Sequence, residues 1–167
     1  MGQYYVIAEV ESDGVTPVSY MKPVGGLKMM EHGGLDSPTV MRMNAYLLDQ
    51  PKRIVWCGDY SPLKCGDVSV YDAAHDTPEM PAGGGLAARY VVNHTRKLFV
   101  DRATYGDKFD DFDSVDPLVV LTSSGCGLGN GDYTGAHLDL VGGWCGDMVS
   151  VSHDEPEGMT RIEVVFR

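Results

Sequence analysis

Residues 53–60 read Arg-Ile-Val-Trp-Cys-Gly-Asp-Tyr, and this stretch predicts the centre of the fold. Successive side chains of a strand point to opposite faces, and residues 54–57 are apolar at every position. Both faces of such a strand are therefore apolar, which is typical of a strand in the middle of a sheet. We expect a central strand that ends at Gly58 and presents the carboxylate of Asp59.

The last four letters of its core, Trp-Cys-Gly-Asp, occur again at residues 144–147. A duplicated fold would repeat the flanking elements too, but the helix and the hairpin predicted below have no counterpart in the other half. The repeat therefore predicts two similar strand ends. Their carboxylates, Asp59 and Asp147, either frame one site or pin two matching structural corners.

Further strands follow from β-branched and aromatic runs between turn residues. Residues 4–10 predict a first strand, and residues 16–21 return antiparallel to it. The clearest hairpin covers residues 89–100, with a turn at Asn93. Additional strands are expected in three stretches, residues 117–122, 143–152 and 161–166.

One helix is well supported by its end signals. Ser37 can cap free backbone N–H groups, and Pro38 suits the first helical position because its missing N–H would be unpaired there. Apolar residues then recur at helical spacing until Pro51. The sequence as a whole predicts one domain, residues 1–167. Its fold class is α+β, mainly antiparallel β-sheet with one principal helix (about 37–49) and glycine-rich loops.

The charge balance restricts the partners. The chain has 167 residues and a formal net charge of −11. Such a charge repels nucleic acid and anionic membranes and favours basic protein surfaces. The four cysteines have no zinc-ligand spacing, so we expect free thiols, with Cys126 in the most exposed context, and a cytoplasmic location.

The most acidic segment interleaves carboxylates with two phenylalanines. It lacks the residue order of a calcium-binding EF-hand loop, so no cofactor is expected beyond casual binding of a divalent cation. Aromatic anchors among carboxylates that steer approach suit a surface for a basic partner. The expected partner-binding residues are Asp107, Phe109, Asp110, Asp111, Phe112, Asp113 and Asp116.

The candidates for catalysis are Asp59, Asp147 and His94. Carboxylates at apolar strand ends could serve as acid and base, and a histidine, with Asp132, could complete a metal site. No metal site is specified by spacing. The glycine-rich run at residues 125–131 lacks the Gly-Lys-Ser/Thr of a phosphate-binding loop, so we expect an irregular surface loop there.

Four segments together resemble an uncharacterised domain family of bacterial and mobile-element proteins. They are Arg-Ile-Val-Trp-Cys-Gly-Asp-Tyr (53–60), Arg-Tyr-Val-Val-Asn-His-Thr-Arg-Lys (89–97), Gly-Asn-Gly-Asp-Tyr (129–133) and Val-Gly-Gly-Trp-Cys-Gly-Asp (141–147). The resemblance implies that the Gly-Asp corners and the hairpin belong to one compact unit. It implies no activity.

Two functions follow as hypotheses. The first is a non-enzymatic acidic module that binds a basic protein surface, for example an inhibitor, of the anti-defence type, of a nucleic-acid-handling protein. The second is a small metal-assisted hydrolase or ligand-binding enzyme built on Asp59 and Asp147. Salt dependence of binding separates the first from the second, which requires stabilisation by metal.

Overall fold

The computed structural model describes residues 1–84, 87–106 and 114–167, which form an α+β fold with a mainly antiparallel sheet. The strands are β1 (Tyr5–Val10), β2 (Pro17–Met21), β3 (Lys52–Gly58), β4 (Lys64–Cys65), β5 (Val68–Ser69), β6 (Tyr90–Asn93), β7 (Leu98–Asp101), β8 (Ser123–Ser124), β9 (Met148–Ser152) and β10 (Thr160–Arg161). Eight of them form one sheet in the order β10-β7-β6-β9-β3-β1-β2, with β8 also paired to β3, whereas β4 and β5 form a separate pair.

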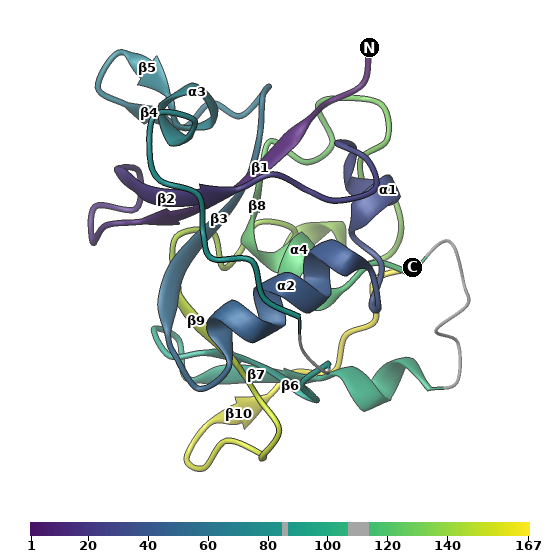
Figure 1. The fold of residues 1–167 in the computed structure, drawn as a ribbon. Coiled ribbons are helices and arrows are strands. Elements are labelled where there is room, and N and C mark those ends of the chain that lie inside the picture. The colour runs from purple at the N-terminus through teal and green to yellow at the C-terminus, as the bar shows by residue number, and fades with distance from the viewer. Residues whose placement is uncertain (85–86, 107–113) are drawn as a thin grey trace.

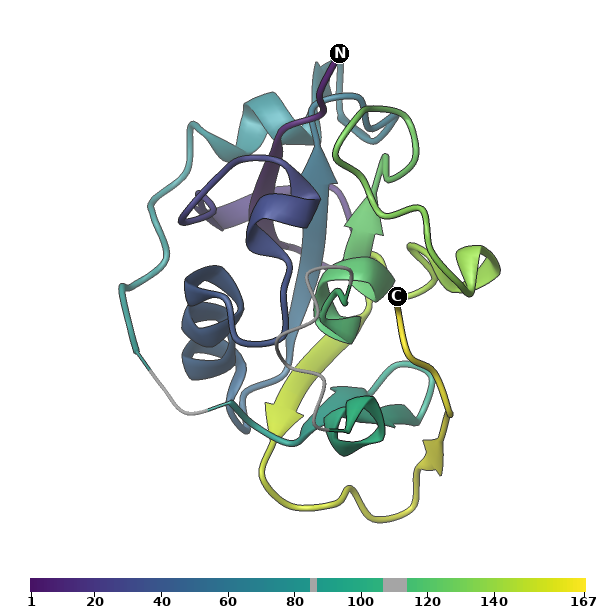
Figure 2. The same ribbon diagram turned by 90° about the vertical axis from the view of Figure 1, so that its right-hand side faces the viewer.

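Several short helices pack against this sheet (Figures 1 and 2). Within the described ranges they are α1 (Met29–His32), α2 (Pro38–Leu47), α3 (Val70–Ala74) and α4 (Pro117–Thr122), with 3₁₀ turns η1 (Arg102–Tyr105) and η2 (Leu138–Leu140). The prediction of one principal helix is therefore not confirmed, although α2 is the longest of the described helices, at ten residues. In the same described residues, no helix has the length and apolar character needed to cross a membrane.

Strand β3 occupies the predicted central position. One edge pairs antiparallel with β1, and the other edge is shared by β9 at its start and β8 near its end. Ile54 and Trp56 face the main core with α2 and α4, whereas Val55 and Cys57 face a second cluster with α3. The alternation predicted from the sequence is confirmed, and burial on both faces follows from it.

The two copies of Trp-Cys-Gly-Asp are not equivalent. The first ends β3 as predicted, and a side chain at Gly58 would overlap that of Gln3. The second copy is wrong as a strand end, because residues 141–147 form turns and the strand begins only at Met148. Gly146 has a φ of 76°, which favours glycine and turns the chain into β9. The shared tetrapeptide thus serves two different local structures.

The predicted hairpins and helix start are confirmed. Strand β2 returns antiparallel to β1, and β7 returns antiparallel to β6. The Ser37 hydroxyl accepts a hydrogen bond from the Val40 N–H at 3.2 Å, with Pro38 at the first helical position. Local signals sufficed here because each element is specified by adjacent residues.

Residues 117–122, predicted as a buried strand, form helix α4 instead. All six residues are buried, and a short apolar run does not distinguish a buried strand from a buried helix. The deciding signal is Asp116 followed by Pro117, a cap and a first-turn proline. The Asp116 carboxylate accepts a hydrogen bond from the Leu118 N–H at 2.9 Å.

Asp116 therefore lies in the core rather than on the expected partner-binding surface. It is 0% exposed and accepts two hydrogen bonds of 2.8 Å from the guanidinium of Arg102. Arg102 also donates to Asn44 and to the Ala88 carbonyl oxygen. The Asp116 carboxylate can be buried because it is paired with the Arg102 guanidinium and also accepts a hydrogen bond from the Leu118 N–H.

We expect Asp116→Asn to destabilise the protein by about 3–5 kcal/mol, because the buried Arg102 guanidinium loses its counter-charge. Urea unfolding measures the change in the free energy of unfolding. The matched control is Glu163→Gln, which removes a carboxylate from an exposed ion pair with Arg161 and is expected to change stability little. Equal effects of the two variants would contradict a structural role for the buried pair.

Helix α1 is fixed to β3 by one buried hydrogen bond. The indole N–H of Trp56 donates to Nε2 of His32 at 2.9 Å, and both residues are 0% exposed. Nε2 must then be unprotonated, so Nδ1–H donates to the Gly26 carbonyl oxygen at 3.1 Å. Burial lowers the pKa of His32 from 6.5 to about 4.

This pKa predicts acid sensitivity. Above pH 6.5 His32 is neutral in the folded and the unfolded state, and its ionisation does not change stability. Between pH 6.5 and about 4 only the unfolded state takes up the proton, so stability falls as the pH falls, by about 3 kcal/mol in all. Below about pH 4 this contribution levels off.

Urea unfolding at several pH values between 7.5 and 4.5 checks the prediction. The His32→Gln variant is expected to show a shallower fall than the wild type. His153→Gln, at an exposed position, is the control and should follow the wild-type curve. Parallel curves for wild type and His32→Gln would contradict the assignment.

Candidate functional site

The carboxylate of Asp59 pins the end of β3 to the start of β1. Its backbone N–H donates to the Tyr4 carbonyl oxygen at 2.8 Å, and its Oδ1 accepts from the Tyr4 N–H at 3.1 Å. These reciprocal bonds extend the pairing of β1 and β3 by one residue. Asp59 thus has the structural role that the corner interpretation assigned to it.

Asp147 pins a different corner. Its Oδ2 accepts hydrogen bonds from Nδ2 of Asn93 at 2.9 Å and from Nε of Arg96 at 2.7 Å. Asn93 is the last residue of β6, and Arg96 lies in the turn between β6 and β7. Asp147 therefore holds this hairpin against the beginning of β9.

The two carboxylates lie at opposite ends of β3. The Gly146 N–H donates to the Ile54 carbonyl oxygen at 2.9 Å, which places the second tetrapeptide beside a residue five positions before Asp59. At about 3.3 Å per residue, the two corners are roughly 17 Å apart. A site that uses both carboxylates is not formed. Among the described residues, no three His, Cys, Asp or Glu side chains are placed to hold one metal ion.

Of the remaining acidic sequence candidates, the structure describes Asp116 and Asp132. Residues Asp107, Phe109, Asp110, Asp111, Phe112 and Asp113 lie outside the described residues, and Asp116 is the buried partner of Arg102. Asp132 is buried and organises the glycine-rich loop. Its Oδ2 accepts from the N–H groups of Gly127 and Gly129, and Oδ1 accepts from the Tyr5 hydroxyl. This carboxylate is fully used by internal hydrogen bonds.

Three of the four thiols, those of Cys57, Cys126 and Cys145, are not activated nucleophiles. None of the four cysteines forms a disulfide. Burial raises the pKa of Cys57 to about 12 and the pKa values of Cys126 and Cys145 to about 11. At neutral pH these groups are thiols rather than thiolates, so they lack the reactive form.

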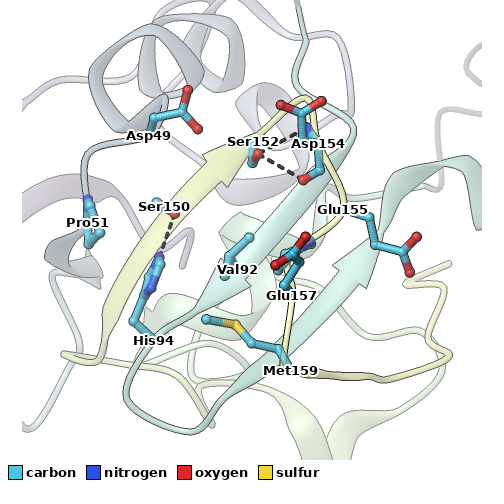
Figure 3. A pocket seen from close by; sticks show the side chains of 11 residues that line it. Asp49, Pro51, Val92, His94, Ser150, Ser152, Asp154, Glu155, Glu157 and Met159 are labelled. Carbon is cyan, nitrogen blue, oxygen red and sulfur yellow. Dashed lines mark hydrogen bonds between the residues drawn. The ribbon is translucent and has the colours of Figure 1, made fainter.

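His94 lies in a pocket, here called the β6–β9 pocket, on the face of the sheet opposite the main core (Figure 3). The cavity has a volume of about 330 Å³. Its lining residues come from the α2–β3 connection, from β6 and β9, and from the segment that follows β9. They are Asp49, Pro51, Val92, His94, Ser150, Ser152, Asp154, Glu155, Pro156, Glu157 and Met159.

Strand register explains the floor of the β6–β9 pocket. Val92 and Ser150 are directly paired across β6 and β9 and point to the same face. Figure 3 shows Asp49 and Pro51 on one side of this floor and Glu155 and Glu157 on the other. The pocket thus has walls from two segments that are about a hundred residues apart in the chain.

The lining of the pocket is strongly acidic. Asp49, Asp154, Glu155 and Glu157 are all exposed, and no ion pair or side-chain hydrogen bond involves their carboxylates among the described residues. The lining contains no lysine or arginine. Burial lowers the pKa of His94, and Lys97 acts in the same direction, so this histidine is neutral at neutral pH. The result is a cavity that favours a cation.

The pair of His94 and Ser150 has hydrogen-bonding geometry but an unsuitable surround for nucleophilic catalysis. Nε2 of His94 and Oγ of Ser150 are 2.7 Å apart. Attack by a serine generates an oxyanion, which needs positive potential or aligned N–H donors. Four carboxylates around the pocket oppose such a charge. The contact therefore orients His94 at the pocket edge.

Sequence reasoning found His94 but missed the rest of the pocket. A weak signal was present in the run Asp154-Glu155-Pro156-Glu157, the acidic segment after β9. Asp49 gave no signal, because it reaches the pocket only through the end of α2. Its N–H donates to the Val151 carbonyl oxygen at 3.0 Å, which fixes the α2–β3 connection beside β9.

Comparisons with protein-family models, curated proteins and solved structures found no match to this chain. The resemblance to a family of bacterial and mobile-element proteins stays a prediction.

Proposed function

We propose that this chain is an acidic, non-enzymatic module that binds a basic surface of another protein. The observation that carries the proposal is the β6–β9 pocket, where four carboxylates surround one cavity without a described internal partner. The net charge of −11 adds a long-range field that attracts a basic partner and repels nucleic acid.

The partner class follows from this charge. A protein that handles nucleic acid has a basic surface that phosphate groups normally occupy. An acidic module that covers this surface competes with nucleic acid and acts as an inhibitor, for example of the anti-defence type. From the sequence, we also expect the acidic run at 107–113 to contribute to binding the basic partner. The proposal includes a cytoplasmic location for the protein.

The alternative is a metal-assisted hydrolase or ligand-binding enzyme that uses Asp59 and Asp147. It requires two carboxylates at one centre, whereas these two are bonded to separate corners about 17 Å apart along β3. Asp132, the third acid considered, accepts internal hydrogen bonds from four donors. The binding proposal is therefore the better supported of the two.

Affinity capture with the full chain, followed by calorimetry on each captured protein, tests the proposed function. We expect a partner with a basic surface, whose affinity falls about tenfold or more between 50 and 300 mM NaCl because the attraction is screened. Nucleic acid should compete with the module. Asp59→Ala should bind like the wild type. Binding that is insensitive to both salt and nucleic acid would contradict the proposal.

Thermal unfolding with Mg²⁺, Mn²⁺, Ca²⁺ or Zn²⁺ tests the alternative. A metal ion that binds only the folded state raises Tm. Because Asp59 and Asp147 do not form one site, we expect no rise beyond that of a salt control. A metal-dependent rise that disappears in both Asp59→Ala and Asp147→Ala would instead support the enzyme hypothesis. A matched variant with the same loss of charge at an exposed site is Asp139→Ala.

A further inference from the structure

We propose that the β6–β9 pocket binds the side chain of an arginine presented by the partner protein. This inference rests on the proposed function and names the group that anchors the partner. It is built on a cavity of about 330 Å³ with Val92 and Ser150 on its floor, and on charge complementarity at its walls.

The cavity exists because a sheet face is only partly covered. Tyr90, Val92 and Phe99 form a small apolar cluster on the outer face of β6 and β7, and Met159 packs against it. The segment 153–159 crosses this face and leaves the space between itself and the α2–β3 connection open (Figure 3). A side chain that enters there can contact the apolar groups of Val92 and Met159.

The walls select a cation. Asp49 stands on one side and Glu155 and Glu157 on the other, so positive charge within the cavity is attracted from both sides. Of the wall carboxylates, Glu155 interacts with Arg89, but the pKa of Arg89 is raised mainly by Asp101 and only slightly by Glu155. Arg89 is engaged with Asp101 through two hydrogen bonds of 2.9 Å, and the wall carboxylates stay available.

The spacing of the carboxylates favours an extended organic cation over a metal ion. A metal ion needs several ligands within about 2.0–2.6 Å of one point. No three ligating side chains among the described residues approach this arrangement. A planar guanidinium spreads its charge and its five N–H donors over a larger area, so it can reach separate carboxylates at once.

The apolar part of the lining favours arginine over lysine. Val92, Pro51 and Met159 offer contacts to the methylene stem of a long basic side chain. A guanidinium is also more weakly hydrated than an ammonium group, so it loses less on entering a partly apolar cavity. The thioether of Met159 is polarisable and adapts to the shape of the entering group. Neutral His94 adds no repulsive charge.

The test is an NMR titration of the ¹⁵N-labelled full chain with three short peptides. They are acetyl-Gly-Arg-Gly-amide, the same peptide with lysine, and the same peptide with citrulline, a neutral analogue of arginine. We expect saturable amide shifts at the non-proline residues of 49–51, 92–94 and 150–159. The arginine peptide should bind about threefold or more tightly than the lysine peptide, and the citrulline peptide should cause no saturable shift.

Two pairs of substitutions separate the pocket from the overall charge. Asp49→Asn with Glu157→Gln should weaken the arginine peptide about fivefold or more, since two walls lose charge. Asp67→Asn with Asp139→Asn removes the same charge at exposed sites outside the pocket lining and should change affinity little. Met159→Ala should weaken binding at constant charge. Unchanged amide spectra of the free variants elsewhere confirm that each one is folded.

Three outcomes would overturn the inference. They are shifts spread over the acidic surface, equal affinities for the arginine and lysine peptides, and equal losses in the two double variants. Each would leave the proposed function standing, because a basic protein could still bind through the long-range field. Conversely, specific arginine binding in a chain that captures no basic protein would refute the proposed function and retain the pocket.

Discussion

The burial of β3 on both faces is the constraint on which the rest of the structure depends. A strand without a polar face must be covered on both sides, and its backbone groups must be paired along both edges. The main core with α2 and α4 covers one face, and the cluster with α3 covers the other. Strands β1, β8 and β9 satisfy the edges. Every other element is positioned relative to this strand.

The two buried polar contacts that dock helices each join definite partners. Asp116 and Arg102 connect the start of α4 to η1, and His32 receives the indole N–H of Trp56 and so docks α1. Such groups specify one arrangement of the helices, because an alternative packing would leave a buried charge or donor unpaired. The carboxylates of the core are thus structural. Those around the β6–β9 pocket are different, since within the described residues they have no internal partner and are free to meet a cation.

Much of the architecture was predictable because its signals are local. The alternation in β3, the Ser37-Pro38 helix start and the β6–β7 hairpin each depend on neighbouring residues, and the structure confirms them. Residues 117–122 were predicted wrongly as a strand, because a six-residue buried run satisfies both strand and helix patterns. The second Trp-Cys-Gly-Asp was misread for a related reason: the same letters suit a strand end and a turn, and only the packing around Trp144 decides between them.

The sequence by itself determined the acidic character of the protein, the α+β class and the central strand, since charge and short-range periodicity are properties of the chain. The tertiary structure alone decided which carboxylates are buried, bonded or free. The carboxylates of Asp116 and Asp132 accept internal hydrogen bonds, whereas Asp49 and Glu157 line the same cavity. The physical reason is that the fate of a charge depends on its distance to partners in space. For the β6–β9 pocket, those distances are set where the α2–β3 connection meets β9, about a hundred residues later in the chain.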